Sequence, residues 1–247
     1  MTSGEFLHHA PCPNCGSKDN LAVYDDHTYC FGCRVHTRTN FTPSKSKARK
    51  EQSHVREFPA DYSVDIPPEG LQWLLKYHLS PVDISKHRIG WSQNGFPIRQ
   101  GAIQYSPLMI FPIYDPNGTL LMWQARYFGK EKLLPKYWTV GAKDILHILG
   151  KGTSSICLVE DVLSSIRVSK HVDSMPLFGS TISTELLVRL YKLGYTDLII
   201  WLDKDKGNYA KDRAVSAKVL FPTTRAIITE LDPKEYTHEQ IRQQFSS

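Results

Sequence analysis

Apolar runs that end on acidic residues dominate the second half of the chain. The run 198–202, Leu-Ile-Ile-Trp-Leu, leads directly into Asp203 and Asp205, and the run 156–159 leads into Glu160. Short apolar runs that contain β-branched residues and stop at turn-forming residues are typical of buried strands. We therefore predict two core strands, each carrying carboxylates at its carboxyl end.

Helical patterns alternate with strand patterns along the same part of the chain. We predict further strands over 175–178 and 225–229, and helices over 162–171, 184–193 and 210–220. Strands that alternate with helices predict crossover connections and a parallel sheet, with functional groups at the carboxyl ends of the strands. Glu160, Asp203 and Asp205 should therefore share one edge of an α/β sheet.

Asp203 and Asp205 form an Asp-x-Asp motif. At a strand end, two such carboxylates present hard oxygen ligands to one small volume, which suits a magnesium or manganese ion. Asp, Lys, Gly and Asn are also ordinary turn formers. The motif alone therefore leaves an acidic turn after a core strand as an equal alternative.

A strand ending in Glu, followed downstream by a strand ending in Asp-x-Asp, resembles the Toprim fold of primases, topoisomerases and related nucleases. The resemblance implies that Glu160, Asp203 and Asp205 hold catalytic magnesium or manganese, or act in acid/base roles. The family usually has Gly directly after the Glu, whereas this chain has Asp161. Whether Asp161 supplies a metal ligand stays open at this point.

Two Cys-x-x-Cys motifs lie near the amino terminus, made of Cys12, Cys15, Cys30 and Cys33. Their spacing is typical of a zinc ribbon, in which each motif supplies two thiolates to one tetrahedral ion. Four thiolates leave no open coordination position, so we predict one structural zinc. Disulfides are the weaker alternative, because a reducing cytosol disfavours them. Cys157 falls in a predicted core strand, where we expect a small buried hydrophobe.

Between the two motifs, residues 21–24 and 28–29 predict two short strands joined by a turn. Four rings here could stack on single-stranded bases: Tyr24, His27, Tyr29 and Phe31. Three basic residues could reach phosphates: Lys18, Arg34 and Arg38. The alternative is that about half of these rings cover the metal site, since so small a domain has little other core. We expect neither His27 nor His36 to replace a cysteine ligand.

Residues 41–58 are polar and basic and lack apolar periodicity, which predicts a linker. Such a segment could tether the ribbon near a polyanion or be a solvated spacer.

The segment 59–150 predicts a small helical part and a hairpin. We expect a helix over 71–78, a second over 82–86 with Ser80 as N-cap, and strands over 108–114 and 120–127 joined by Asp-Pro-Asn-Gly. Along the second strand, alternation puts Met122, Gln124 and Arg126 on one face, opposite Trp123, Ala125 and Tyr127.

Basic and aromatic residues interleave in this segment: Arg88, Arg99, Arg126, Lys130, Lys132, Lys136, Lys143, Tyr114, Trp123, Tyr127, Phe128, Tyr137 and Trp138. Basic charge beside exposed rings suits a template strand or nucleotide phosphates. Half of these rings could equally belong to the core.

These elements resemble the amino-terminal subdomain of the RNA polymerase domain in bacteriophage primases of the primase-helicase type. The resemblance implies that Arg126 faces template or nucleotide and that Lys136, Tyr137 and Trp138 follow it. With the ribbon in front, it covers nearly the whole chain. The expected fold class is α/β: a zinc ribbon joined by a linker to a primase RNA polymerase domain that contains a Toprim parallel sheet. The expected modules are 1–40 ribbon, 41–58 linker, 59–150 amino-terminal subdomain and 151–247 Toprim subdomain.

Composition says little about the partners and cellular location of the protein. The chain has 247 residues, 41% of them hydrophobic, and a formal net charge of +5 from 30 basic and 25 acidic residues. This mild charge permits nucleic-acid binding without requiring it. Because the sequence contains neither a membrane-spanning run nor a secretion signal, we expect a cytoplasmic protein without a membrane partner. The resemblance suggests the cytoplasm of a phage-infected bacterium.

The expected activity is synthesis of short RNA primers on a single-stranded DNA template from ribonucleoside triphosphates, by metal-dependent nucleotidyl transfer. Lys204 and Lys206 could clamp the triphosphate or could point to solvent. Because the sequence has no Gly-x-x-x-x-Gly-Lys-Ser/Thr loop, we expect a separate replicative helicase as partner. The alternatives are a Toprim-type nuclease that uses the same acids, and a non-catalytic zinc-ribbon protein that binds single-stranded DNA.

Overall fold

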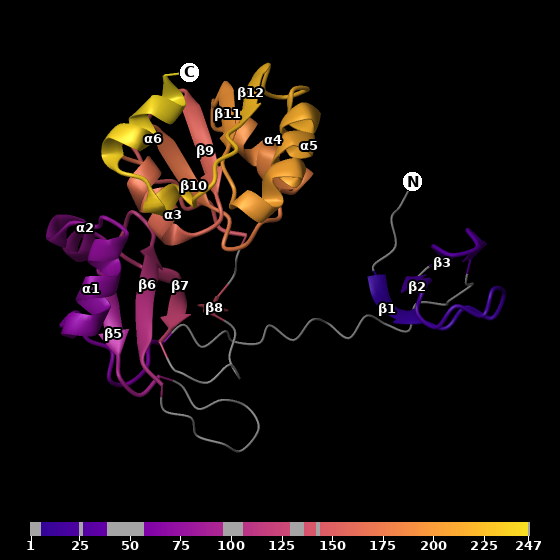
Figure 1. The fold of residues 1–247 in the computed structure, drawn as a ribbon, viewed down its shortest axis with the longest axis horizontal. Coiled ribbons are helices and arrows are strands. Elements are labelled where there is room, and N and C mark those ends of the chain that lie inside the picture. Colours follow the sequence, from indigo (N-terminus) through magenta and orange to yellow (C-terminus); the bar gives the residue numbers. More distant parts are fainter. Residues whose placement is uncertain are drawn as a thin grey trace. The chain divides into compact units, whose positions relative to one another are not determined.

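The computed structural model describes residues 6–24, 27–38, 57–95, 106–128, 136–141 and 144–246. The chain divides into two compact units, Met1–Ser53 and His54–Ser247, which are described separately (Figure 1). The predicted linker lies outside the described residues except for 57–58, as do Arg99, Lys130, Lys132 and Lys143. Within the described ranges, no helix has the length and apolar character needed to cross a bilayer.

The first unit is an antiparallel sheet of four short strands in the order β1-β2-β3-β4. The strands are β1 (Phe6–Ala10), β2 (Leu21–Tyr24), β3 (His27–Cys30) and β4 (His36–Arg38). The two central strands match the predicted pair, and the two outer strands were not predicted. The outer strands carry no apolar alternation: most of β1 is exposed, so its pairing with β2 is invisible in the sequence pattern.

The second unit begins with α1 (Pro68–Lys76) and α2 (Pro81–Lys86). Ser80 caps α2 as predicted, since its hydroxyl accepts from the Asp83 N–H at 3.2 Å while the Asp83 carboxylate accepts from the Ser80 N–H at 2.9 Å. A four-stranded antiparallel sheet follows, in the order β5-β6-β7-β8. Its strands are β5 (Gly90–Ser92), β6 (Leu108–Tyr114), β7 (Leu120–Tyr127) and β8 (Tyr137–Val140).

The β6–β7 hairpin has the predicted bounds. Asp115 closes its turn by accepting N–H groups from Asn117 and Thr119 at 2.9 and 2.7 Å, and Gly118 takes a left-handed conformation with φ of 81°. The predicted alternation is confirmed as well. Met122 packs in the core that includes α1, whereas Trp123 and Ala125 pack in a second cluster on the opposite face.

The carboxy-terminal half forms a four-stranded parallel sheet in the order β10-β9-β11-β12. Its strands are β9 (Ser155–Val159), β10 (Asp173–Pro176), β11 (Asp197–Ile200) and β12 (Thr223–Ala226). The helical elements are α3 (Val162–Val168), α4 (Thr184–Lys192), η1 (Lys204–Lys206), α5 (Gly207–Ala217), η2 (Pro233–Glu235) and α6 (His238–Phe245). The predicted strand and helix types are confirmed, with ends that move by a few residues.

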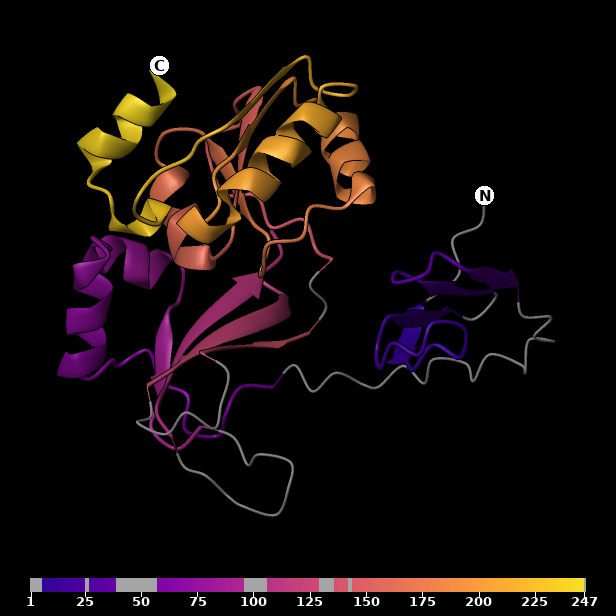
Figure 2. The ribbon, with the colours of Figure 1, turned by 45° about the vertical axis from the view of Figure 1, so that its right-hand side comes forward.

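Helices cover both faces of this sheet (Figure 2). Ile156, Leu158 and Leu198 pack with residues of α4 and α5, whereas Cys157 and Trp201 pack with residues of α3 and α6. Each central strand is therefore buried on both faces, which explains its continuous apolar run. Cys157 is fully buried, as expected of a core residue.

Candidate metal and nucleotide sites

The four cysteines of the ribbon meet at one point, which we call the thiol cluster. Their sulfur atoms all lie within 4.8 Å of one another. The Sγ–Sγ distance is 3.8 Å between Cys12 and Cys33 and 3.7 Å between Cys15 and Cys30. Four thiolates held about 2.3 Å from one ion in a tetrahedron lie about 3.8 Å apart. The thiol cluster therefore has the dimensions of a closed zinc site.

The local backbone explains how each Cys-x-x-Cys motif reaches this arrangement. The N–H of Gly16 donates to the Cys12 carbonyl at 2.9 Å, and the N–H of Arg34 donates to the Cys30 carbonyl at 2.8 Å. Gly16 and Arg34 are both left-handed, with φ of 70° and 60°. The two motifs thus fold as equivalent turns that aim their sulfurs at one point.

Local donors prepare two of these thiols for a metal. The pKa of Cys15 is lowered to about 6, chiefly by the Ser17 hydroxyl, and the pKa of Cys30 is lowered chiefly by the backbone N–H of Cys33. Thiolates, not thiols, bind zinc. Neither His27 nor His36 joins the thiol cluster, in agreement with the expectation that cysteines alone supply the ligands.

Rings on the ribbon pair with one another. Tyr24 stacks on His27 with centroids 4.2 Å apart, and Tyr29 meets Phe31 edge-on at 5.1 Å. Phe31 is 60% exposed, whereas the other three are half-buried. Phe31 is therefore the ring with the most surface left for a partner. Lys18 and Arg34 are exposed, and the Arg38 side chain lies outside the part of the chain that the structure describes.

The carboxyl ends of β9 and β11 carry the three predicted acids, which we call the acid edge: Glu160, Asp203 and Asp205. Glu160 and Asp203 are direct neighbours, since the Asp203 N–H donates to Glu160 Oε1 at 3.1 Å. This follows from the parallel pairing of β9 with β11, which places Leu158 opposite Ile200. Residues that are 43 positions apart thus meet, as the sequence pattern predicts.

Asp203 is the electrostatic centre of the acid edge. Its pKa is raised to about 7, chiefly by burial and also by the neighbouring carboxylate of Glu160, while the charge of Lys234 acts in the opposite direction. Burial likewise raises the pKa of Glu160. Asp203 Oδ1 is buried and, within the described part of the chain, has no hydrogen-bond partner. A buried carboxylate oxygen without a donor is costly, and a divalent cation would satisfy it.

Asp205 stands apart from this pair. It is exposed and its Oδ2 lies 3.0 Å from the Lys206 ammonium. Among the described residues, the thiol cluster is the group of three or more His, Cys, Asp or Glu side chains placed to hold a metal ion, and the three acids do not form such a group. Asp205 would have to leave Lys206 to join Glu160 and Asp203 at one ion.

The two lysines of the Asp-x-Asp segment lie at the surface. Lys204 pairs with Glu230, and both side chains are more than half exposed. Exposed ion pairs of this kind contribute at most about 1 kcal/mol. A phosphate group could therefore displace the partner carboxylate at low cost.

A lysine bridge that the sequence did not predict lies behind the acid edge. Lys234 Nζ lies 2.7 Å from Asp161 Oδ2 and 2.7 Å from Asp232 Oδ2. Asp161 also caps α3, because its Oδ1 accepts from the Ser164 N–H at 2.9 Å. Both oxygens of Asp161 are thus engaged within the protein, which answers why this chain has Asp at the position after Glu160. An Asp followed by Pro is a local signal for the start of a helix, and it could have indicated η2 but not the partners of Lys234.

Arg126 lies among aromatic rings on the face of the antiparallel sheet that carries α1. Its guanidinium carbon is 5.3 Å from the centre of the Tyr137 ring and 5.8 Å from that of Trp73. Arg126 Nη1 is buried and, in the described ranges, unpartnered. Burial raises the pKa of Tyr137, and both Asp161 and Arg126 act on that phenol. Tyr137 therefore links the Arg126 face to the lysine bridge.

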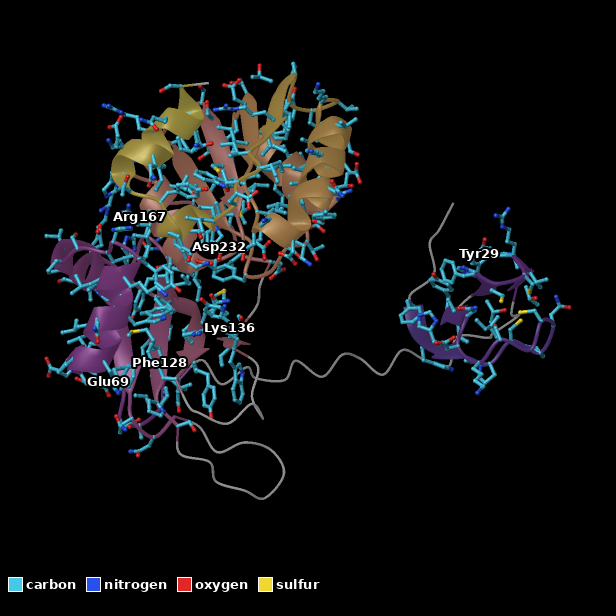
Figure 3. The ribbon with its side chains drawn as sticks, in the orientation of Figure 1. Tyr29, Glu69, Phe128, Lys136, Arg167 and Asp232 are labelled. Carbon is cyan, nitrogen blue, oxygen red and sulfur yellow. The ribbon has the colours of Figure 1, made fainter. Side chains whose placement is uncertain are left out.

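The structure separates the residues that follow Arg126 in the predicted set. Arg126 pairs with Tyr137 across the strands, whereas Trp138 pairs with Ala125 on the opposite face. Lys136 is exposed, with its ammonium 5.8 Å from the Tyr137 ring. Figure 3 shows Lys136 and Asp232 on the two sides of the junction between the sheets. Tyr137 and Lys136 thus stay near Arg126, and Trp138 does not.

Solved structures of primases have a similar architecture. The protein is similar in structure to the primase fragment of the bacteriophage T7 primase-helicase, with a TM-score of 0.52 and 17% identity. The match covers 98% of each chain. The Aquifex aeolicus primase, represented by its zinc-binding and RNA polymerase domains, matches 100% of this chain and 79% of its own, with a TM-score of 0.55 and 15% identity. The fold is that of these primase domains. The parallel sheet, with acids after β9 and β11, has the arrangement predicted for a Toprim sheet, and we use that name for it.

The match at the level of sequence is short. A DNA helicase/primase of Enterobacteria phage T3 is 53% identical over 36 residues, which are 14% of this chain and 6% of that protein. The aligned part thus spans a small fraction of the curated relative's length. No family model matches the chain.

A buried arginine joins distant segments of the second unit. Arg167 of α3 is fully buried and donates to the carbonyls of His78 and Tyr236 at 2.9 and 2.8 Å (Figure 3). Its Nη1 also lies 2.7 Å from His238 Nε2. Burial and the charge of Arg167 lower the pKa of His238 to about 4, so a neutral imidazole can accept this hydrogen bond. Arg167 therefore ties the end of α1, α3 and the carboxy-terminal segment together.

Proposed function

We propose that this chain is a DNA primase that synthesises short RNA primers on single-stranded DNA by metal-dependent nucleotidyl transfer. The observation that carries the proposal is the acid edge. Glu160 and Asp203 meet at the carboxyl ends of β9 and β11, with Asp203 Oδ1 buried and unpartnered among the described residues. The fold match over nearly the whole chain supports the same conclusion.

In the proposed reaction, Glu160, Asp203 and Asp205 hold one or two magnesium or manganese ions. The bound metal would stabilise negative charge on the attacked phosphate and on the departing pyrophosphate. Asp203 must be ionised to act as a ligand, and its pKa of about 7 makes that step sensitive to pH. Glu160 is a candidate for accepting the proton of the attacking 3′-hydroxyl, because burial raises its pKa toward the working range.

Arg126 is proposed to contact the template or the nucleotide. Its buried, unpartnered Nη1 can donate to a phosphate oxygen, while the rings of Trp73 and Tyr137 hold the guanidinium in place. Lys136 would add charge at the same face, and Lys204 and Lys206 would approach the triphosphate from the acid edge. Trp138 is proposed to contact the template from the opposite face of the sheet.

The ribbon is proposed to select the site on single-stranded DNA where synthesis begins, with zinc holding its shape. Solved relatives include a DnaG primase catalytic domain bound to single-stranded DNA, with 16% identity over 74% of this chain. A separate replicative helicase is proposed as partner. We also propose the module bounds 1–40, 41–58, 59–150 and 151–247, and a cytoplasmic location in a phage-infected bacterium.

The test is template-directed RNA synthesis by the purified, zinc-loaded chain. The reaction contains single-stranded DNA oligonucleotides, four ribonucleoside triphosphates with one labelled, and Mg²⁺ or Mn²⁺. We expect short labelled RNA products that Asp203→Asn abolishes. The matched control is Asp197→Asn, which changes an aspartate at the opposite end of the same strand and should leave synthesis intact.

Other outcomes would reject the proposal. Shortened DNA without any need for ribonucleotides would establish a Toprim-type nuclease instead. DNA binding that Asp203→Asn leaves unchanged, with no turnover even when a replicative helicase is added, would establish a binding module.

A further inference from the structure

The lysine bridge places a permanent positive charge inside the group of acids. The Lys234 side chain is 5% exposed, and its ammonium lies at hydrogen-bonding distance from both Asp161 and Asp232. On its far side, the ammonium lies 5.9 Å from the centre of the Tyr77 ring. A lysine is rarely this buried unless it is paired, so its position is set by these carboxylates.

Capping contacts hold the segments that carry the lysine bridge. Lys234 belongs to η2, where the Asp232 N–H donates to the Glu235 carboxylate at 3.0 Å and the Glu235 N–H donates to the Asp232 carbonyl at 2.9 Å. Asp161 is held in turn by its cap contact with Ser164. The backbone positions of the lysine and of both carboxylates are therefore set by local structure.

Two carboxylates near the acid edge are thereby taken out of use as metal ligands. One oxygen each of Asp161 and Asp232 faces the ammonium, and the other oxygen of Asp161 faces a backbone N–H. Both carboxylates are close enough to act electrostatically on Asp203. A second divalent ion placed among them would meet the ammonium at close range, where like charges repel strongly in a buried site.

We infer that Lys234 serves as a resident cation in place of a second metal ion, so that the acid edge binds a single divalent ion. This inference rests on the proposed function and specifies it further. Glu160, Asp203 and Asp205 hold the exchangeable ion, and Lys234 supplies fixed positive charge on the side of Asp161 and Asp232. Lys234 is thus a positioning residue that sets the metal stoichiometry of the site.

The test counts Mn²⁺ ions bound by the full, zinc-loaded chain without nucleotide or DNA, by the loss of the free Mn²⁺ electron paramagnetic resonance signal and by calorimetry. We expect one Mn²⁺ per chain for the wild type. Lys234→Met should bind a second Mn²⁺ at least about tenfold more tightly than the wild type does, because the repelling charge is gone and two carboxylates are free. Mn²⁺ should also raise the melting temperature of Lys234→Met more than that of the wild type.

Two further variants keep the result interpretable. Lys170→Met breaks the 2.6 Å pair between Lys170 and Asp83, elsewhere in the same unit, and should still bind one Mn²⁺. The triple variant Asp161→Asn, Lys234→Met, Asp232→Asn removes the bridge without leaving free carboxylates, and should also bind one. If Lys234→Met does not fold, Lys234→Gln takes its place with the same expected count, because it removes the charge, keeps both carboxylates and retains N–H groups that can donate to them.

Two outcomes overturn the inference in distinguishable ways. Two Mn²⁺ ions of similar affinity in the wild type, or one ion in folded Lys234→Met, would reject the role of Lys234 and leave the primase proposal standing. No Mn²⁺ binding by the wild type would reject both the inference and the metal role of the acid edge.

Discussion

The zinc ribbon and the Toprim sheet each have four strands, but they are held together by different forces. In the ribbon the buried apolar residues within the described ranges are Ala22 and two cysteines of the thiol cluster. In the Toprim sheet, clusters of fully buried aliphatic and aromatic residues cover both faces. A small sheet without such a core needs a metal to fold, whereas the larger sheet can leave acids unsatisfied at its edge.

Removal of zinc should have the largest effect, and it tests directly whether the two sheets are stabilised by different forces. A chelator should unfold the ribbon and leave the Toprim sheet folded, because structural zinc contributes about 10 to 16 kcal/mol in small zinc domains. All five tryptophans lie beyond residue 53, so their fluorescence reports the second unit alone. Ribbon unfolding would be followed by amide resonances of residues 6–38.

Matched cysteine variants complete that experiment. Cys12→Ser should lose zinc, whereas Cys157→Ser, which alters a core thiol of the Toprim sheet, should keep it. Ribbon resonances that stay dispersed after chelation would contradict the metal-dependent picture.

The next largest effect is expected in the core of the Toprim sheet. Leu158 of β9 is fully buried, and Leu158→Ala should lower the free energy of unfolding by about 2 to 5 kcal/mol through lost burial and a cavity. Urea unfolding followed by tryptophan fluorescence measures this. Val219→Ala, at a residue 90% exposed, should change it by less than about 0.5 kcal/mol. Equal effects of the two variants would be inconsistent with the assigned core.

The acid edge should show a smaller, pH-dependent effect. The pKa of Asp203 is raised to about 7 in the folded protein, so ionising it costs stability. That cost is absent near pH 4, grows as pH rises, and is complete above pH 7. In metal-free buffer, Asp203→Asn should therefore exceed the wild type in unfolding free energy at pH 8 by about 2 kcal/mol, roughly half of what the full pKa shift corresponds to because solvent screens the partly exposed carboxylate, and match it near pH 4.

The same urea titrations at pH 4.5, 6 and 8 supply the measurement, with Asp197→Asn as control. An advantage of Asp203→Asn that is constant across this range would show that burial of the charge is not its cause.

The smallest effect on stability is expected at the exposed ring of the ribbon. Phe31→Ala should leave zinc affinity and ribbon unfolding nearly unchanged, within about 0.5 kcal/mol, because Phe31 is 60% exposed. If this ring stacks on a base, affinity for single-stranded DNA should fall by about 1 to 3 kcal/mol. Fluorescence anisotropy with a labelled oligonucleotide separates the two readouts. A large loss of ribbon stability would instead assign Phe31 to the core.

Much of the RNA polymerase domain fold could be predicted because its signals are local. The β6–β7 hairpin has the predicted bounds, since two apolar runs flank an Asp-Pro-Asn-Gly turn and the second run alternates between two faces. The helix after Ser80 begins where a capping residue followed by Pro predicts it. Strand β1 escaped prediction because its exposed residues carry no pattern that pairing would leave in the sequence.

The candidate sites divide in the same way. The proximity of Glu160 and Asp203 could be predicted from the sequence, because the carboxyl ends of parallel strands lie at one edge of a sheet. The sequence did not show which face of the sheet would carry Lys136, Tyr137 or Trp138, because neither strand alone predicts the pairing of β8 with β7. Arg167 gave no sign of its role, since its partners are two backbone carbonyls from distant segments.

The cysteines of the thiol cluster and the succession of buried strands along the chain could be predicted, because both depend on spacing over a few residues. The surroundings of Asp203 depend on tertiary packing. Lys234 meets Asp161 across 73 positions of the chain, and that contact exists only once α3 and η2 have packed. Charge interactions depend on distance in space, so the electrostatics of the acid edge were set by packing that no local pattern encodes.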